Sequence, residues 1–200
     1  MEYRPSDIAP FPAQVQDTKT AIRFLRINAS RYRIDPQHVA LWGDSSGGHT
    51  ALMTGFTGDD APDMDAYREQ SAAVNCIVDW YGPTDIAKMN YYPSVQDHIG
   101  PESPEGFVIG RKNVLESPEL ADATVPMNYL SREKGTPPLL IMHGGSDMLV
   151  PFNQSCRLYH KMKELGKTVE FVKLVGANHG FGGFNCEEAL DMVEEIIKKY

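Results

Sequence analysis

The stretch Val39-Ala40-Leu41-Trp42-Gly43-Asp44-Ser45-Ser46-Gly47-Gly48-His49 decides the fold of this 200-residue chain. Its centre, Gly43 to Gly47, fits the pattern G-x-S-x-G, in which a serine lies on a sharp turn between a strand and a helix. The apolar run before the turn is strand-sized, and the small residues after it suit a helix packed closely against a sheet. The pattern predicts Ser45 as a nucleophile. The plainer interpretation is a glycine-rich turn whose serine caps a helix.

Strands and helices alternate on both sides of this turn. The runs with strand character are 39–42, 73–80, 138–143 and 169–175, and the runs with helical spacing are 15–32, 47–56, 154–165 and 187–199. Such alternation is typical of βαβ units. The sequence therefore predicts an α/β fold, with a mostly parallel sheet and helices on both faces.

One connection is much longer than the others. Residues 84–136 are rich in Pro, Met and Tyr and lie between the second and third predicted strands. A connection of this length is not a simple crossover, so we expect a cap-like insertion over the sheet. No shift in composition marks a boundary, and residues 1–200 are expected to form one domain.

Two loops carry the groups that a nucleophilic serine requires. A serine hydroxyl needs a base to take its proton and a third group to orient that base. In this pattern an acid and then a histidine follow the serine along the chain, and Asp147 follows the third predicted strand as His179 follows the fourth. The carboxyl ends of parallel strands meet at one edge of a sheet, so we expect Ser45, His179 and Asp147 to form a catalytic triad.

Other titratable groups fit these roles less well. His143 ends the third predicted strand and is expected to orient the Asp147 loop. Asp44 occupies the variable position of the turn, and Asp85 follows the wrong strand. The remaining histidines are expected to be structural or at the surface; they are His38, His49, His98 and His160.

Three aromatic residues near the expected site are candidates for the wall of a substrate pocket. They are Trp80, Tyr81 and Phe184. Core packing is an equally good interpretation of these rings, because large aromatic side chains contribute much of the buried area in protein cores.

The composition excludes several classes of protein. The net charge of −8 argues against nucleic acid or anionic membrane surfaces as partners, and no apolar run is long enough for a membrane span. Three widely spaced cysteines indicate neither a disulfide scaffold nor a zinc site, so we expect no metal. With no secretory signal at the start and cysteines that look reduced, a cytoplasmic location is expected.

Beyond these residues, the chain resembles the α/β-hydrolase superfamily. Within it, the chain is most similar to bacterial esterases of the hormone-sensitive-lipase-like and feruloyl/acetylxylan esterase branch. The stretches that carry the resemblance are 9–17, 34–36, 42–49, 81–85, 142–147 and 176–180. The resemblance implies Ser45 as nucleophile, His179 as general acid and base, and Asp147 as its orienting acid. It also implies ester hydrolysis through an acyl-enzyme, with no cofactor.

The chain departs from this family ahead of Ser45. An oxyanion hole needs two or more donors, and the backbone N–H of Ser46 supplies one. The family's other donor comes from an upstream His-Gly-Gly-type loop, which the residues before Ser45 do not contain. We therefore expect a truncated fold that lacks leading strands and hydrolyses esters slowly. The run 39–42 would then be an exposed edge, which favours a homo-oligomer.

The leading hypothesis is a serine esterase acting on small esters. One alternative is a non-catalytic remnant or interaction module, because the upstream loop is missing. Another is a serine peptidase of the prolyl-oligopeptidase kind, although such enzymes usually carry a large N-terminal propeller that is not present in this sequence.

Overall fold

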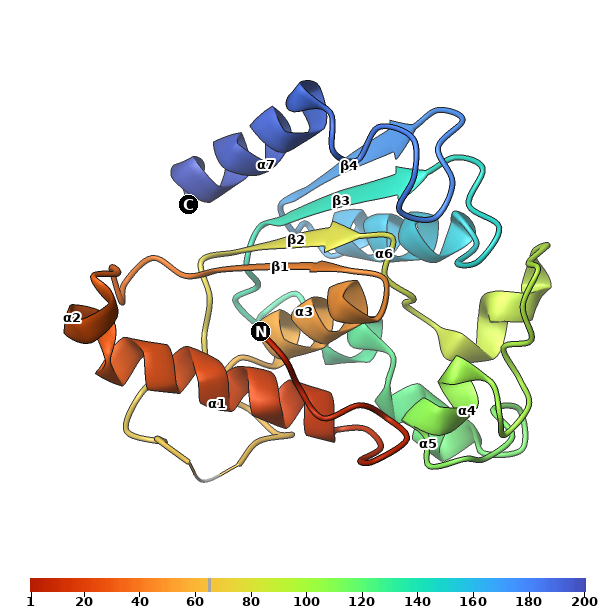
Figure 1. Ribbon diagram of the computed structural model, residues 1–200, viewed down its shortest axis with the longest axis horizontal. Helices are drawn as coiled ribbons and strands as arrows, with labels where there is room; N and C mark the ends of the chain where they lie inside the picture. Colours follow the sequence, from red (N-terminus) through yellow and green to blue (C-terminus); the bar gives the residue numbers. More distant parts are fainter. Residues whose placement is uncertain (65) are drawn as a thin grey trace.

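The computed structural model describes residues 1–64 and 66–200, and a parallel sheet lies at its centre (Figure 1). Its four strands, in spatial order, are β1 (Ala40–Asp44), β2 (Cys76–Trp80), β3 (Leu139–Gly144) and β4 (Val169–Leu174). All neighbouring pairs are parallel. The predicted α/β class and mostly parallel sheet are confirmed, and the carboxyl ends of the strands meet at one edge.

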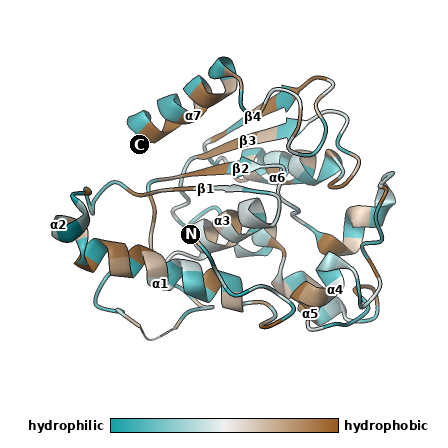
Figure 2. Cartoon of the chain, viewed as in Figure 1, coloured by the Kyte–Doolittle hydropathy of each residue, from teal (hydrophilic) through white to brown (hydrophobic). Residues whose placement is uncertain are grey.

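Helices cover both faces of this sheet, as predicted. Helices α3 (Ser46–Thr57) and α6 (Asn153–Glu164) pack on one face, and α7 (Glu187–Lys199) packs on the other (Figure 1). Helix α1 (Ala13–Ile27) packs on α3 rather than on the strands. Figure 2 shows mixed hydropathy along α1 and α7, as expected for amphipathic helices with one face toward the core.

The predicted helix 15–32 is wrong in one respect, because Asn28 divides it. Helix α1 ends at Ile27, and a short helix α2 (Ala29–Tyr32) follows. The Asn28 side chain donates a hydrogen bond to the Phe24 carbonyl at 2.8 Å. Asparagine interrupts helices in this way because its amide competes with the backbone for hydrogen bonds.

The second strand is shorter than predicted and begins at Cys76 rather than at residue 73. Just before β2, two hydrogen bonds connect Asn75 and Val39. The Asn75 backbone N–H donates to the Val39 carbonyl at 2.8 Å, and the Val39 N–H donates to the Asn75 side chain at 2.9 Å. A side chain therefore takes the place of one rung of the ladder at this end of the sheet.

The long connection between β2 and β3 folds into short helices beside the carboxyl edge of the sheet (Figure 1). They are η1 (Ile86–Tyr91), α4 (Pro104–Val108), α5 (Pro118–Ala123) and η2 (Pro126–Tyr129). We call this segment, residues 84–136, the cap. It has a small apolar core of its own, made of Ile86, Ile109, Val114 and Ala121. Among the described residues, no helix has the length and apolar character needed to cross a membrane.

Candidate active site

Ser45 lies on the sharp turn between β1 and α3. Its backbone has φ 50° and ψ −121°, a left-handed conformation that is strained for a residue with a side chain. Its N–H donates to the Trp80 carbonyl at 2.9 Å, which ties the turn to β2. A side chain at Gly43 would run into the backbone of Gly47, so the strand and the helix can approach each other only because Gly43 has none.

His179 reaches this serine from the loop after β4. Its Nε2 lies 2.9 Å from Oγ of Ser45. The neighbouring Asn178 orders the loop, because its side-chain oxygen accepts the N–H of His179 at 2.8 Å and the N–H of Met148 at 3.1 Å. Asn178 thus joins the His179 loop to the loop after β3. Sequence reasoning missed this role, since an asparagine beside a histidine carries no distinctive pattern.

Asp147 completes the chain of contacts from the loop after β3. Its Oδ2 lies 2.8 Å from Nδ1 of His179, and its Oδ1 accepts the N–H groups of Leu149 and Val150, each at 2.9 Å. Burial by itself would raise the pKa of this carboxyl. Hydrogen bonds from His143, His179 and the Leu149 backbone outweigh burial and hold the pKa well below its usual range. Asp147 therefore stays ionised beside the imidazole.

His143 supports the Asp147 loop from beneath, as expected from its position at the end of β3. Its ring is fully buried, and Nδ1 lies 2.7 Å from Oγ of Ser155. On the other side, Nε2 lies 3.0 Å from the Val150 carbonyl and 3.3 Å from Oδ2 of Asp147. A proton on Nε2 therefore stabilises the loop and the carboxylate together.

Tyr81 packs against the histidine of this chain. The ring centroids of Tyr81 and His179 are 4.6 Å apart, and the Tyr81 hydroxyl donates to Oδ2 of Asp44 at 3.2 Å. Tyr81 itself has φ 47°. Burial, and after it the nearby Asp44 carboxylate, raise the pKa of this phenol, so it stays protonated. The ring limits the orientations open to the imidazole.

Together these contacts connect the Ser45 hydroxyl, the His179 imidazole and the Asp147 carboxylate in series. The three side chains come from three separate loops at the same edge of the sheet. Such a series of groups can move a proton from a hydroxyl to an imidazole while the carboxylate stabilises the charge that develops. Ser46 is the first residue of α3, where a backbone N–H has no acceptor within the helix. It is available to bind a negative charge that forms next to Ser45.

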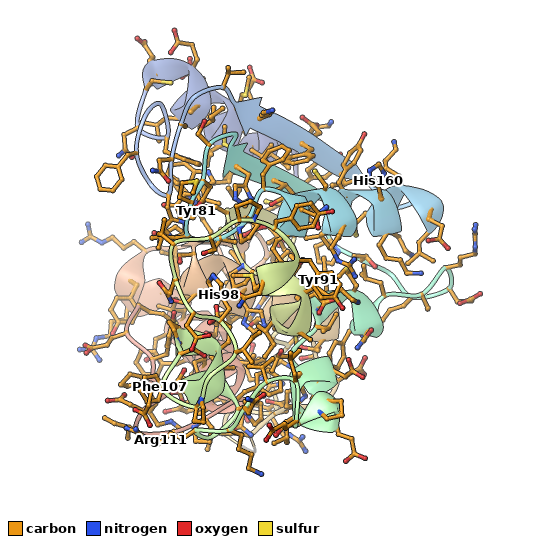
Figure 3. All side chains as sticks on the ribbon, turned by 90° about the vertical axis from the view of Figure 1, so that its right-hand side faces the viewer. Tyr81, Tyr91, His98, Phe107, Arg111 and His160 are labelled. Carbon is orange, nitrogen blue, oxygen red and sulfur yellow. The ribbon has the colours of Figure 1, made fainter. Side chains whose placement is uncertain are left out.

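A cavity of about 250 Å³ opens from Ser45 beneath the cap. On the sheet side it is lined by Ser45, Ser46, His49, Pro83, Leu149, Val150 and His179, and on the cap side by Ile86, Gln96, His98, Pro104, Glu105 and Val108. Figure 3 looks onto this edge of the sheet and shows His98, from the cap, below Tyr81. The floor of the cavity comes largely from the segments that carry Ser45, Asp147 and His179, and its roof comes from the cap.

The three aromatic candidates border a different hollow, on the β1 side of the nucleophile. Trp80, Tyr81 and Phe184 line a depression of about 450 Å³ together with Trp42 and Asp44. They also pack on one another, since the ring centroids of Tyr81 and Phe184 are 4.6 Å apart and those of Trp80 and Phe184 are 5.3 Å apart. All three are nearly buried. They therefore belong to the core beneath α7 and also border this hollow.

One buried carboxyl near the site was not anticipated from the sequence. Asp79, on β2, is fully buried between Gly48 of α3 and Gly82 of the turn that leads to the cap. The Gly82 N–H donates to its Oδ1 at 3.0 Å, while Oδ2 has no partner among the described residues. Burial raises the pKa of Asp79 to about 8, and the Gly82 bond offsets only part of that effect. Alternation along a buried strand gives no signal for such a group.

The remaining histidines and acids lie away from the proton path. His38 contacts Asp35 on the surface, and His49 is buried with Nε2 2.7 Å from the Thr124 carbonyl. Asp85 pairs with Lys88 and Arg157. His160 lies on α6, which is above the cap in the view of Figure 3. Within residues 1–64 and 66–200, no group of three or more His, Cys, Asp or Glu is arranged to hold a metal ion.

Comparison with known proteins places this geometry in a family context. The family model described as BD-FAE matches residues 1–162. Among curated proteins, esterase LipQ of Mycobacterium tuberculosis (strain ATCC 25618 / H37Rv) is 28% identical over 183 residues, covering 90% of this chain and 42% of LipQ. The chain spans between 41% and 44% of the length of the three mycobacterial relatives that it matches.

Solved structures agree with these matches. A truncated form of a carbohydrate esterase from gut microbiota has a TM-score of 0.89 and 32% identity, covering all of this chain and 72% of that one. A thermophilic esterase of the Planctomycetes species Thermogutta terrifontis, with butyrate bound, has a TM-score of 0.70 and 26% identity, covering 98% of this chain and 66% of that one. The expected resemblance to α/β-hydrolase esterases is confirmed.

Proposed function

Because this chain belongs to the BD-FAE family, and because LipQ and the Thermogutta terrifontis protein that it matches are named as esterases, we propose that it is a serine esterase of small carboxylic esters. The observation that carries the proposal is the pair of contacts at 2.9 Å and 2.8 Å that join Ser45, His179 and Asp147. Neither a capping serine nor a structural histidine requires this arrangement. The proposed reaction proceeds through an acyl-enzyme.

In the first half of the reaction, Oγ of Ser45 attacks the ester carbonyl carbon while Nε2 of His179 takes the hydroxyl proton. The Asp147 carboxylate stabilises the imidazolium that forms. The carbonyl oxygen becomes an oxyanion, and the Ser46 N–H is the donor that we assign to it. The C–O bond to the alcohol then breaks, and the alcohol leaves with the proton from His179. In the second half, water repeats these steps on the acyl-enzyme and releases the acid.

The single assigned oxyanion donor sets the expected rate. Losing one donor from an oxyanion hole costs on the order of 10²–10³ in rate. An enzyme with the Ser46 N–H as its one donor is expected to turn over activated aryl esters faster than unactivated esters, because the better leaving group needs less stabilisation of the oxyanion.

The test is covalent labelling with a fluorophosphonate probe, together with hydrolysis of an aryl acetate. We expect labelling and turnover in the wild-type protein and loss of both in Ser45→Ala. Ser146→Ala is the matched control, because Ser146 is exposed on the Asp147 loop and its side chain makes no assigned contact. Folded protein that is not labelled would support a non-catalytic module, and turnover of a prolyl peptide amide would support a peptidase.

We also propose that substrates are small-molecule esters and that the hollow bordered by Trp80, Tyr81 and Phe184 takes part of the substrate. Its aromatic walls stand next to the turn that carries Ser45. The net charge of −8 supports neither nucleic acid nor an anionic membrane as partner. The three cysteines are free, which favours a reducing, cytoplasmic environment.

A second proposal concerns association of the chain with itself through β1. Among the described strands, β1 pairs only with β2, so one of its edges carries backbone groups free to pair with another chain. The Trp42 side chain on this strand is 47% exposed, although it packs edge-on against Trp80 with centroids 4.9 Å apart. Pairing through residues 39–42 of two copies would cover both the strand edge and this ring.

A further inference from the structure

A buried pair of charged groups lies in the roof of the cavity that opens from Ser45. His98 and Glu105 are both on the cap, and they are 2% and 6% exposed. Nδ1 of His98 lies 2.9 Å from Oε1 of Glu105, as an ionic contact rather than an aligned hydrogen bond. Both residues line the same cavity as Ser45 and His179. None of the steps assigned to the triad uses them.

Polar groups face both ring nitrogens of His98. Nε2 lies 2.8 Å from the Ser94 hydroxyl oxygen, which in turn lies 3.1 Å from the Met148 carbonyl oxygen and 3.0 Å from the Leu149 carbonyl oxygen. Nδ1 faces a carboxylate oxygen of Glu105, which favours a proton on Nδ1. Burial lowers the pKa of His98, but the Glu105 carboxylate outweighs burial and raises it above the usual value.

Glu105 is left with one oxygen that the described residues do not satisfy. Its Oε1 faces Nδ1 of His98, whereas its Oε2 is buried with no hydrogen-bond partner among them. A buried acceptor without a donor costs free energy, so such groups call for an explanation in a native structure. Of the other roof residues, Ile86, Pro104 and Val108 are apolar, and the Gln96 side chain forms no hydrogen bond with Oε2 of Glu105. A hydroxyl group of a bound ligand would supply the missing donor.

Resting on the esterase function proposed above, we propose that Glu105 is a specificity-determining residue that accepts a hydrogen bond from a hydroxyl group of the substrate. His98 is the positioning residue that holds the carboxylate at the roof of the cavity and balances its charge. The enzyme then prefers esters that carry a hydroxyl on the portion that enters the cavity. A site built to bind a hydroxyl rejects an analogue without it, because the buried acceptor is then left unpaired.

The test measures kcat/KM for two matched pairs of esters. In the first pair the hydroxyl is on the acyl side, as 4-nitrophenyl 3-hydroxybutyrate against 4-nitrophenyl butyrate. In the second it is on the alcohol side, as 4-hydroxybutyl acetate against butyl acetate. In the wild-type protein we expect a preference of roughly tenfold to a hundredfold for the hydroxylated member of one pair, the size expected for one hydrogen bond to a charged group. The pair that shows it identifies which part of the ester enters the cavity.

Variants at Glu105 then separate recognition from folding. Glu105→Met keeps the length of the side chain without its oxygens, and we expect the preference to fall to about one. Glu105→Gln keeps an acceptor without the charge, and we expect an intermediate preference. The matched control is Glu102→Met, also on the cap, because the Glu102 side chain is 75% exposed and should leave the preference unchanged. Damage to the fold would lower kcat/KM for both members of a pair and leave their ratio unchanged.

A binding measurement keeps the inference separate from the proposed reaction. In Ser45→Ala protein, which cannot turn the esters over, calorimetry is expected to show tighter binding of the hydroxylated ester than of the plain one. Equal affinities would overturn the inference, as would a preference that survives Glu105→Met. Absence of Ser45-dependent turnover for every ester, with the difference in affinity intact, would overturn the esterase function and leave the hydroxyl site standing.

Discussion

The two hollows on either side of Ser45 differ in how they are enclosed. The cavity beneath the cap is closed by contacts between distant segments, such as the Val95 N–H bonded to the Met148 carbonyl at 2.9 Å. A second such contact joins His49 to the Thr124 carbonyl at 2.7 Å. Among the described residues, none from the cap lines the hollow beside β1, and the Trp42 ring in its wall is nearly half exposed.

This difference shows that the proton path and the binding surfaces have separate structural origins. Ser45, His179 and Asp147 are held mainly by their own strands and loops, and of the wall residues Tyr81 packs directly against the His179 ring. The cap side can discriminate between substrates, because its polar groups are enclosed among apolar side chains. The β1 side adds an open surface, where another molecule has access to the strand and to Trp42. Changes to the shared centre should therefore affect both sides alike, and changes to wall residues that do not touch His179 should affect only one side.

The largest expected effect comes from the centre that both sides share. Asp147→Asn leaves His179 without a negative partner and allows the wrong tautomer, so we expect kcat to fall by about 10⁴. Aryl ester hydrolysis at saturating substrate measures it, for substrates of either side. Asp191→Asn, on the exposed face of α7, is the control. A loss of less than tenfold in Asp147→Asn would show that Asp147 does not act through His179.

A smaller effect is expected from Asp79, which lies between Gly48 of α3 and Gly82 of the turn that leads to the cap. Its folded-state pKa of about 8 exceeds the unfolded value near 3.9. Between those pH values the folded protein keeps a proton that the unfolded chain has lost, so stability falls as pH rises. From pH 5 to pH 7 the fall is roughly 2.7 kcal/mol from this one group.

Asp79→Asn replaces this acid with a neutral group of the same shape and should remove that fall. Urea unfolding at pH 5, 6 and 7 measures it, and we expect the variant to gain stability relative to wild type as pH rises. Asp191→Asn again serves as the control. Parallel pH profiles for wild type and Asp79→Asn would contradict a neutral Asp79 in the folded state.

The smallest effect is expected on the open side. Trp42→Lys removes the exposed ring from β1 and places a charge at the strand edge, which opposes pairing with another chain. We expect self-association to weaken about tenfold, a modest change for one aromatic contact, while Ser45 is still labelled by the fluorophosphonate probe. Sedimentation velocity at micromolar concentration measures it.

Phe181→Lys is the comparison for this edge, because Phe181 is 77% exposed on the loop that carries His179 rather than on β1. It should leave association unchanged. A wild-type protein that is a monodisperse monomer by light scattering at micromolar concentration would refute pairing through β1 directly.

Much of the fold follows from short-range patterns. The alternating strands and helices predict the parallel sheet, and the predicted helix 187–199 matches α7 at both ends. The errors occur where side chains replace backbone contacts. Asn28 divides a helix that apolar spacing makes continuous, and Asn75 delays the start of β2. Neither contact leaves a periodic signal, because each depends on a single amide finding a particular carbonyl or N–H.

The sequence by itself determines the sharp turn at Ser45 and the chain order of Asp147 and His179. Those features are local, since a strand, a turn and a helix form them from neighbouring residues, and parallel strands bring their carboxyl ends together. Only the tertiary structure places His98 and Glu105 in the roof above Ser45 and leaves Trp42 exposed beside it. These positions depend on how a long connection packs against loops far away in the chain, and the spacing of residues does not encode that packing. His98, expected to be merely structural, faces the cavity for this reason.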